Sequence, residues 1–270
     1  MKKQLKESGY SIRHSAHAGT FYPDSAETIT QYIEAFDKVE KVVLKENIRA
    51  FIVPHAGYIY SGFTANLAYM QLEHTKSKRA IVIGPSHSVA FEGMSISLYD
   101  SYETPFGTLN VDLPYAQMLK EKFDIAFDER MHREHSTEVQ MPFIKYYAPQ
   151  MQVIEMVYGF YSPQELSRII IALLEDPDNL VIISTDLSHF HTEEEANRLD
   201  DICMKAIDER DVPLLHQGCE ACGKIGVEAI LLSAKALSLQ TKLLDYRTSS
   251  WATKDRSSVV GYGSAVLYSE

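Results

Sequence analysis

Three apolar runs of the sequence each end in residues that can bind a metal ion or transfer a proton. "FIVPH" ends in His55, "RAIVIGPSH" ends in His87, and "LVIISTDLSH" carries Asp186 and ends in His189. Two imidazoles and one anionic donor, with coordination positions left open, suit non-haem Fe(II) oxygen chemistry, and a similar set suits zinc hydrolysis. One such histidine alone reads more simply as a hydrogen-bonded surface residue. The repetition favours one shared site.

The segments that carry these residues have the pattern of a layered α/β protein. Short apolar runs at residues 49–53, 81–84, 152–158 and 179–185 alternate with segments of helical spacing. This alternation predicts a central mixed, partly parallel sheet flanked by helices. In such sheets the ligand site lies beyond the carboxyl ends of the strands. If the strands are neighbours, His55, His87 and Asp186 converge.

Turn and capping residues define the other expected elements. A helix is expected over residues 26–39, capped by Asp24 or Ser25, and capping boxes at Ser162 and Thr192 open two more. Further helices are expected over residues 64–72, 113–123 and 223–237, with a strand at 94–98 and a hairpin in "ETPFGTLNVD". The last two strands, "KLLDYRTS" and "SSVVGYGSAVLYS", are expected to extend the sheet antiparallel.

Composition excludes several classes of protein. The chain has 270 residues, 45% of them hydrophobic and 23% charged, and no linker or repeat divides it, so a single domain over residues 1–270 is expected. The formal net charge of −11 argues against a nucleic-acid partner. The basic start lacks the apolar stretch of a signal peptide, and no run is long enough to cross a bilayer. We therefore expect a cytoplasmic protein with no membrane association.

The three cysteines are interpreted as free thiols, core residues or ligands, because an odd count in a chain of this size argues against a disulfide framework. Cys222 precedes an expected helix, whose positive end favours a thiolate. A buried structural cysteine and a redox pair with Cys219 are the alternatives. The redox pair is disfavoured because no thioredoxin-like strand directly precedes it. From these residues alone the role of Cys222 stays open.

Eight segments, in order and over nearly the full chain, resemble the Memo family. They are "AGTFYP", "VPHAGYIYSG", "IGPSH", "ETPFGTL", "EHSTEVQMPF", "STDLSHF", "CGKIGVEA" and "DRSSVVGYGSAVLY". That family is similar in fold to the catalytic subunit of LigB-type class III extradiol dioxygenases. The resemblance implies that His55, His87 and Cys222 bind one transition metal, iron(II) or copper, with zinc as a further option. It also implies that Asp186 and His189 line the same pocket.

Histidine exchanges protons near neutral pH, so His189 is the candidate for proton transfer, and Asp186 would orient it or bind the metal. Alternatively, "TDLSH" only caps the following helix. His135 and Glu138 of "EHSTEVQ" would form an outer layer that orients ligands or substrate, or would only start a helix. Six other histidines, among them His17 and His132, have no motif support.

Three functions are consistent with these residues. The first is a metal-dependent redox enzyme that acts on a small molecule. The second is a non-catalytic binding or regulatory protein that uses the same pocket for a peptide or protein partner, and the third, less favoured, is a zinc hydrolase. Family analogy adds a radical-SAM protein as a partner in modification chemistry.

Overall fold

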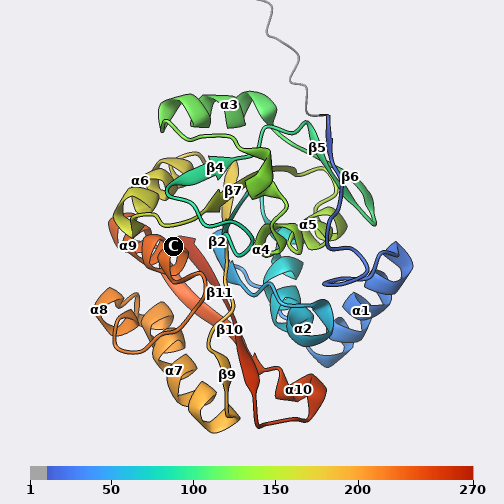
Figure 1. Cartoon of the computed structure of the whole chain (residues 1–270), viewed down its shortest axis with the longest axis vertical. Helices are drawn as coiled ribbons and strands as arrows, with labels where there is room; N and C mark the ends of the chain where they lie inside the picture. Colours follow the sequence, from blue (N-terminus) through green and yellow to red (C-terminus); the bar gives the residue numbers. More distant parts are fainter. Residues whose placement is uncertain (1–10, 270) are drawn as a thin grey trace, which may run out of the picture.

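The computed structural model describes residues 11–269, in which a mixed sheet forms the centre of the molecule (Figure 1). Most of the basic start of the chain lies outside the described residues. The eight-stranded sheet has the order β10-β11-β2-β8-β3-β7-β4, and β9 pairs with β11. Its strands are β2 (Asn47–Val53), β3 (Arg79–Pro85), β4 (Met94–Ile96), β7 (Gln152–Tyr158), β8 (Asn179–Ser184), β9 (His189–His191), β10 (Gln240–Thr248) and β11 (Val259–Ser269). The predicted fold class is confirmed.

The four central strands β2, β8, β3 and β7 run parallel. Nearly all their residues are buried, as expected for strands covered on both faces. Val53 pairs with Ser184, and Ile83 pairs with Ile183, so β2, β8 and β3 end together at one edge. β10 and β11 pair antiparallel, as expected, and the segment between them carries α10 (Ser250–Thr253) (Figure 1).

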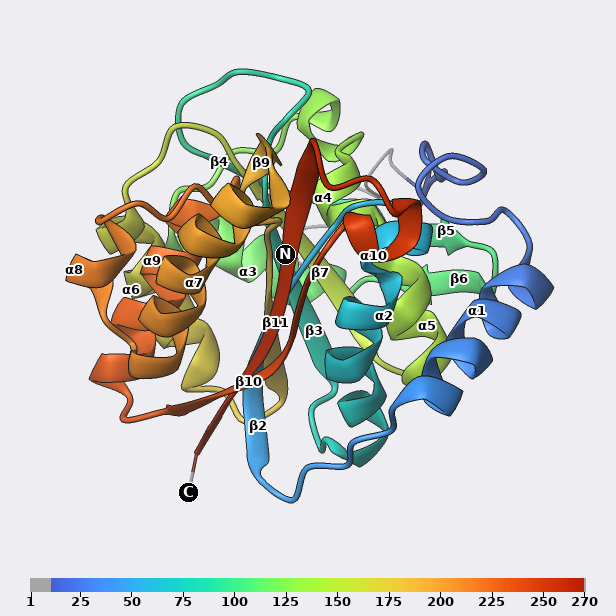
Figure 2. The same ribbon diagram turned by 90° about the horizontal axis from the view of Figure 1, so that it is seen from below.

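Helices cover both faces of this sheet (Figure 2). One face is covered by α6 (Pro163–Leu174), α7 (Glu193–Glu209), α8 (Val212–Leu215) and α9 (Lys224–Ala236), with α3 (Leu113–Lys122) contributing to the same core. The other face is covered by α1 (Ala26–Val39), α2 (Tyr58–Tyr69) and α5 (Met141–Tyr147), with the 3₁₀ helix η1 (Met70–His74). A small sheet of β1 (Ile12–Arg13), β5 (Ser101–Thr104) and β6 (Gly107–Asn110) lies beside it, and η2 (Glu129–His132) and α4 (His135–Glu138) complete the elements.

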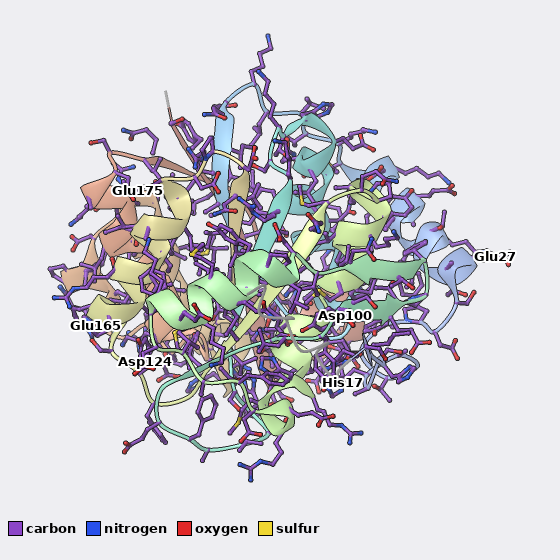
Figure 3. All side chains as sticks on the ribbon, turned by 90° about the horizontal axis from the view of Figure 1, so that it is seen from above. His17, Glu27, Asp100, Asp124, Glu165 and Glu175 are labelled. Atoms are coloured by element: carbon purple, nitrogen blue, oxygen red, sulfur yellow. A yellow bond between two sulfur atoms is a disulfide. The ribbon has the colours of Figure 1, made fainter. Side chains whose placement is uncertain are left out.

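Acidic side chains contribute to the negative charge of the periphery. Glu27, Glu165 and Glu175 are exposed and point outward from their helices (Figure 3).

No helix within residues 11–269 combines the length and the apolar character that crossing a bilayer requires.

Capping residues set several helix starts where the sequence predicts them. The side chains of Ser25, Ser162 and Thr192 accept hydrogen bonds from backbone N–H groups in the first turns of α1, α6 and α7. The helix expected from residue 64 begins at Tyr58 instead. Apart from Ile59 and Tyr60 its residues are buried, so no polar face marks where it starts.

A disulfide joins Cys203 on α7 to Cys219 in the segment before α9, with a Cα–Cα distance of 4.8 Å. The expectation that the cysteines form no disulfide was therefore wrong, because an odd count excludes only complete pairing. The bond also occupies the partner that a Cys219–Cys222 redox pair would need. Cys222 is the free cysteine of the described chain.

Substitution of Ile83 by Asp is expected to unfold the protein, because Ile83 is fully buried in the central strand β3. A buried, unpaired carboxylate costs several kcal/mol, out of a total stability of about 5–15 kcal/mol. Ile59→Asp is the matched control, since Ile59 is 59% exposed, and its unfolding free energy should stay within about 0.5 kcal/mol of the parent. Urea denaturation measures both variants. Equal stability of the two would contradict the burial of β3.

Candidate functional site

Three candidate ligand residues converge at the carboxyl edge of the sheet. His55 follows β2, His87 follows β3, and Cys222 precedes α9. One donor atom from each lies within 4.8 Å of the others. The Nε2 atom of His55 is 3.4 Å from the Cys222 sulfur, and the centroids of the two imidazole rings are 5.1 Å apart. This grouping can hold a metal ion.

Two glycines allow the close backbone approaches that this grouping needs. A Cβ atom on Gly223 would lie 2.7 Å from the Ser184 carbonyl oxygen, and a Cβ on Gly84 would lie 2.6 Å from the Ser136 hydroxyl. The absence of a side chain at Gly223 brings the Cys222 turn against the end of β8. The same feature at Gly84 brings α4 against the end of β3.

Asp186 ties His55 to Cys222. Its Oδ1 atom accepts a hydrogen bond of 2.8 Å from the backbone N–H of His55, and its Oδ2 atom is 3.9 Å from the His55 Nε2. Its backbone N–H donates to the Cys222 sulfur, and its carbonyl oxygen accepts the Cys222 N–H, both at 3.2 Å. Asp186 therefore fixes the distance between the end of β2 and the start of α9.

The protonation states of His55 and Cys222 follow from burial. Burial lowers the pKa of His55 to about 4, so the imidazole is neutral at neutral pH. Burial and the nearby Asp186 raise the pKa of the Cys222 thiol to about 12. This outweighs the helix N-terminus, which by itself favoured a thiolate. A bound cation would supply the charge that removes the thiol proton.

Glu134 is the central residue that the sequence interpretation missed. Its Oε1 atom is 2.8 Å from the Nδ1 atom of His135 and 3.2 Å from the Nδ1 atom of His87, and its Oε2 atom accepts the backbone N–H groups of His87 and Ser88. Burial alone would raise the pKa of Glu134, but hydrogen bonds from His135 and His87 lower it. One carboxylate therefore orients two imidazole rings.

His135 lies against the cluster. Its ring centroid is 4.7 Å from that of His87 and 5.4 Å from that of His55, and the Phe21 ring stacks on it at 4.5 Å. Together with His87 and Glu134 it forms a second group of donor atoms within 4.8 Å. His17, which had no motif support, approaches the His135 ring to 5.8 Å.

Glu138 anchors the segment that carries His17 and Phe21. Its carboxylate accepts the backbone N–H groups of Ala16 and His17 and the Tyr22 hydroxyl, and it pairs with Arg13. It therefore acts on the site through the loop that packs over His135. A neighbouring buried pair, His132 and Glu155, was also missed, because its partners are 23 residues apart in the sequence.

His189 lies on β9, beside β11, where its strand partner is Val260. The nearby Asp200 is a buried carboxyl whose pKa is raised mainly by burial, and a charge on the His189 ring would lower it. Within residues 11–269, no described hydrogen bond, ion pair or ring contact joins His189 to His55, His87 or Cys222. Its role in proton transfer stays a prediction.

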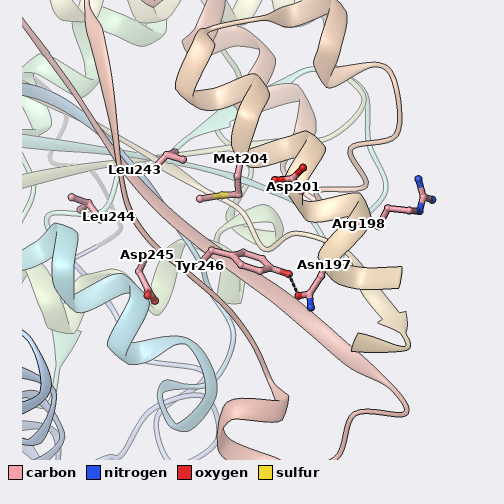
Figure 4. A pocket seen from close by; sticks show the side chains of 8 residues that line it. All are labelled: Asn197, Arg198, Asp201, Met204, Leu243, Leu244, Asp245 and Tyr246. Atoms are coloured by element: carbon pink, nitrogen blue, oxygen red, sulfur yellow. Dashed lines mark hydrogen bonds between the residues drawn. The ribbon is translucent and has the colours of Figure 1, made fainter. Parts of the chain in front are cut away.

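A groove lies away from the histidines, between α7 and β10 (Figure 4). It has a volume of about 640 Å³, and Met204, Leu243, Leu244 and Tyr246 form its apolar part. None of the residues that line it belongs to the two groups of donor residues around His87.

A family model and individual relatives both match nearly the whole chain. The family described as Memo-like protein matches residues 13–266. A "MEMO1 family protein" of Aquifex aeolicus is 32% identical over 265 residues, covering 93% of this chain and 97% of that protein. A namesake from Methanobrevibacter smithii is 31% identical over 280 residues, covering 95% and 99%.

Solved structures of similar fold include one from Escherichia coli. The "uncharacterized protein JW3007 from Escherichia coli K12" gives a TM-score of 0.52 at 12% identity, covering 81% of this chain and 99% of that one. At this identity the likeness shows the fold alone. The expected similarity to LigB-type dioxygenases stays a prediction.

The neutral state of His55 predicts how stability depends on pH. The folded protein holds the His55 pKa near 4, against an ordinary value of 6.5, so below pH 6.5 the unfolded chain binds a proton that the folded chain refuses. Between pH 7 and pH 5 this group should remove about 2 kcal/mol of stability. The loss ends near pH 4, where the folded protein also takes up the proton.

Urea unfolding of metal-free protein at pH 7 and pH 5, compared with His55→Gln, isolates this contribution from those of other histidines. The variant should lose about 2 kcal/mol less than the parent over the same interval. An identical pH dependence of the two proteins would contradict a neutral, buried His55.

Proposed function

The chain belongs to the Memo-like family, and from this premise we propose that it binds one transition metal ion through His55, His87 and Cys222 and carries out redox chemistry on a small molecule. The observation that carries the proposal is the convergence of three donor atoms within 4.8 Å from three separate elements. In the chain, His87 follows His55 by 32 positions, and Cys222 follows His87 by 135.

The spacing of the donors fits a metal ion. With bonds of about 2.1 Å to nitrogen and 2.3 Å to sulfur at a tetrahedral angle, the two ligand atoms would be about 3.6 Å apart. The His55 Nε2 and the Cys222 sulfur are 3.4 Å apart. The Nδ1 atoms of both histidines already have partners, Ser184 for His55 and Glu134 for His87. Metal-binding histidines are commonly held in this way, with the other nitrogen left for the ion.

The donor set limits the choice of metal. A thiolate and two imidazoles favour iron, copper or zinc over magnesium or calcium. Bound iron or copper would supply electron transfer and oxygen chemistry, whereas zinc would supply only a Lewis acid. The proposed redox function rests on the first two.

Residues of the chain supply positioning and proton transfer. Asp186 holds His55 and Cys222 at their mutual distance. His135, whose Nδ1 is held by Glu134, is placed to exchange a proton with a bound molecule through its Nε2. Phe21, stacked on His135, forms an apolar wall at the same place.

Protein purified without oxygen is expected to carry about one transition metal per chain. Because each ligand contributes directly, His87→Ala and Cys222→Ala should each lose most of it, and so should His55→Ala. His14→Ala is the matched control and should keep full occupancy, since His14 is an exposed histidine paired with Glu103. Elemental analysis with circular dichroism to confirm folding decides the matter. Full occupancy in all three ligand variants would refute the site.

Ring cleavage of catechols is expected to be weak or absent. A thiolate donates more charge to iron than the carboxylate used in extradiol cleavage, so the reactivity of the iron should differ. The assay is oxygen uptake by Fe(II)-loaded protein with a panel of catechols, and Cys222→Glu should shift metal preference toward Fe(II). Rapid ring opening by the parent, lost in His189→Ala, would overturn this expectation and support the role predicted for His189.

A further inference from the structure

Ser184 and Gln140 form a buried hydrogen-bond chain behind His55. The Ser184 hydroxyl has three partners: the Ser136 carbonyl oxygen at 2.5 Å, the Gln140 side-chain nitrogen at 2.9 Å and the His55 Nδ1 at 2.8 Å. Both Ser184 and Gln140 are fully buried, and His55 is 2% exposed. With so little exposure, these polar groups depend on one another to satisfy their hydrogen bonds.

The orientation of the Gln140 amide is fixed by its other partners. Its nitrogen is 3.0 Å from the Pro54 carbonyl oxygen, which can only accept, and its oxygen is 2.8 Å from the Tyr69 hydroxyl. A flipped amide would place two oxygens against each other at Pro54. The NH₂ group therefore faces Pro54 and Ser184, with the Ser136 carbonyl oxygen farther away at 3.4 Å. Its two hydrogens go to the nearer acceptors, Pro54 and Ser184.

The single proton of the Ser184 hydroxyl then has only one destination. A hydroxyl donates once and accepts twice. The Ser136 carbonyl can only accept, so it receives the proton, and the Gln140 amide uses one acceptor position. The remaining partner, the His55 Nδ1, meets an oxygen lone pair and must carry a hydrogen itself.

We infer that Ser184 and Gln140 are positioning residues that lock neutral His55 as the Nδ1–H tautomer, with a bare Nε2 directed at the Cys222 sulfur. For its consequence in metal binding this inference rests on the proposed function, since a metal binds the nitrogen that lacks a proton. The tautomer itself does not depend on a metal. The inference assigns a role to Gln140 of "EHSTEVQ" and Ser184 of "STDLSHF", neither of which is a candidate ligand.

Removal of the Ser184 hydroxyl should release the tautomer. In Ser184→Ala the Nδ1–H group has no acceptor, whereas a hydrogen on Nε2 could turn toward the Cys222 sulfur at 3.4 Å or the Asp186 Oδ2 at 3.9 Å. The Nε2–H form then gains population, and a metal must displace that hydrogen. Ser264→Ala is the matched control, because the Ser264 hydroxyl is buried and has no hydrogen-bond partner among residues 11–269.

The test is ¹⁵N NMR of the imidazole nitrogens in chelator-treated full-length protein at pH 7, with the His55 signals assigned by their loss in His55→Gln. The unmodified protein should show a protonated Nδ1 and a bare Nε2. Ser184→Ala should shift the ring toward Nε2–H, and its dissociation constant for Co²⁺ should rise about 10- to 100-fold. Ser264→Ala should change neither the tautomer nor the affinity.

If the His55 signals of the unmodified protein show the hydrogen on Nε2, the inference is overturned by that spectrum alone. An unchanged tautomer in folded Ser184→Ala would also overturn it. If the unmodified protein shows the expected tautomer but does not bind Co²⁺, the proposed metal function fails while the lock itself stands. The two proposals are thereby tested separately.

Discussion

The parallel pairing of β2, β8 and β3 is the constraint on which the site depends. These strands are neighbours in register, so Pro54, Thr185 and the residues after Pro85 leave the sheet at one edge. Their side chains are buried on both faces, and a slip of one residue would exchange the packing of the two cores. Packing of the apolar runs thus fixes the register, and His55, Asp186 and His87 are brought together as a consequence.

Polar groups at this edge are buried in sets that satisfy one another. Glu134 accepts from two imidazoles and three backbone N–H groups. Ser184 joins His55 to Gln140 and to the Ser136 carbonyl. Hydrogen bonds of this kind offset the cost of removing a carboxylate from water. They also hold each ring in one orientation, so little reorganisation remains when a ligand binds.

Local patterns predicted the elements, and long-range partners escaped prediction. Apolar runs and capping residues such as Ser25 act over a few positions, so strands and several helix starts could be read from the sequence. Glu134 is 47 residues from His87, and only the packing of α4 on β3 reveals their contact. The Cys203–Cys219 disulfide likewise depends on how α7 lies against the segment before α9. Glu138 was predicted to orient ligands or substrate, a role that stays a prediction. Its partners lie in residues 13–22, far away in the sequence.

The central claim is that one ion would be shared by His55, His87 and Cys222. X-ray absorption spectroscopy of the metal-loaded protein tests it most directly, because sulfur and nitrogen neighbours differ in scattering and in distance. The account predicts one sulfur at about 2.3 Å together with nitrogen donors at about 2.0–2.1 Å, and loss of the sulfur contribution in Cys222→Ala. A bound metal with only nitrogen and oxygen neighbours in the unmodified protein would contradict it.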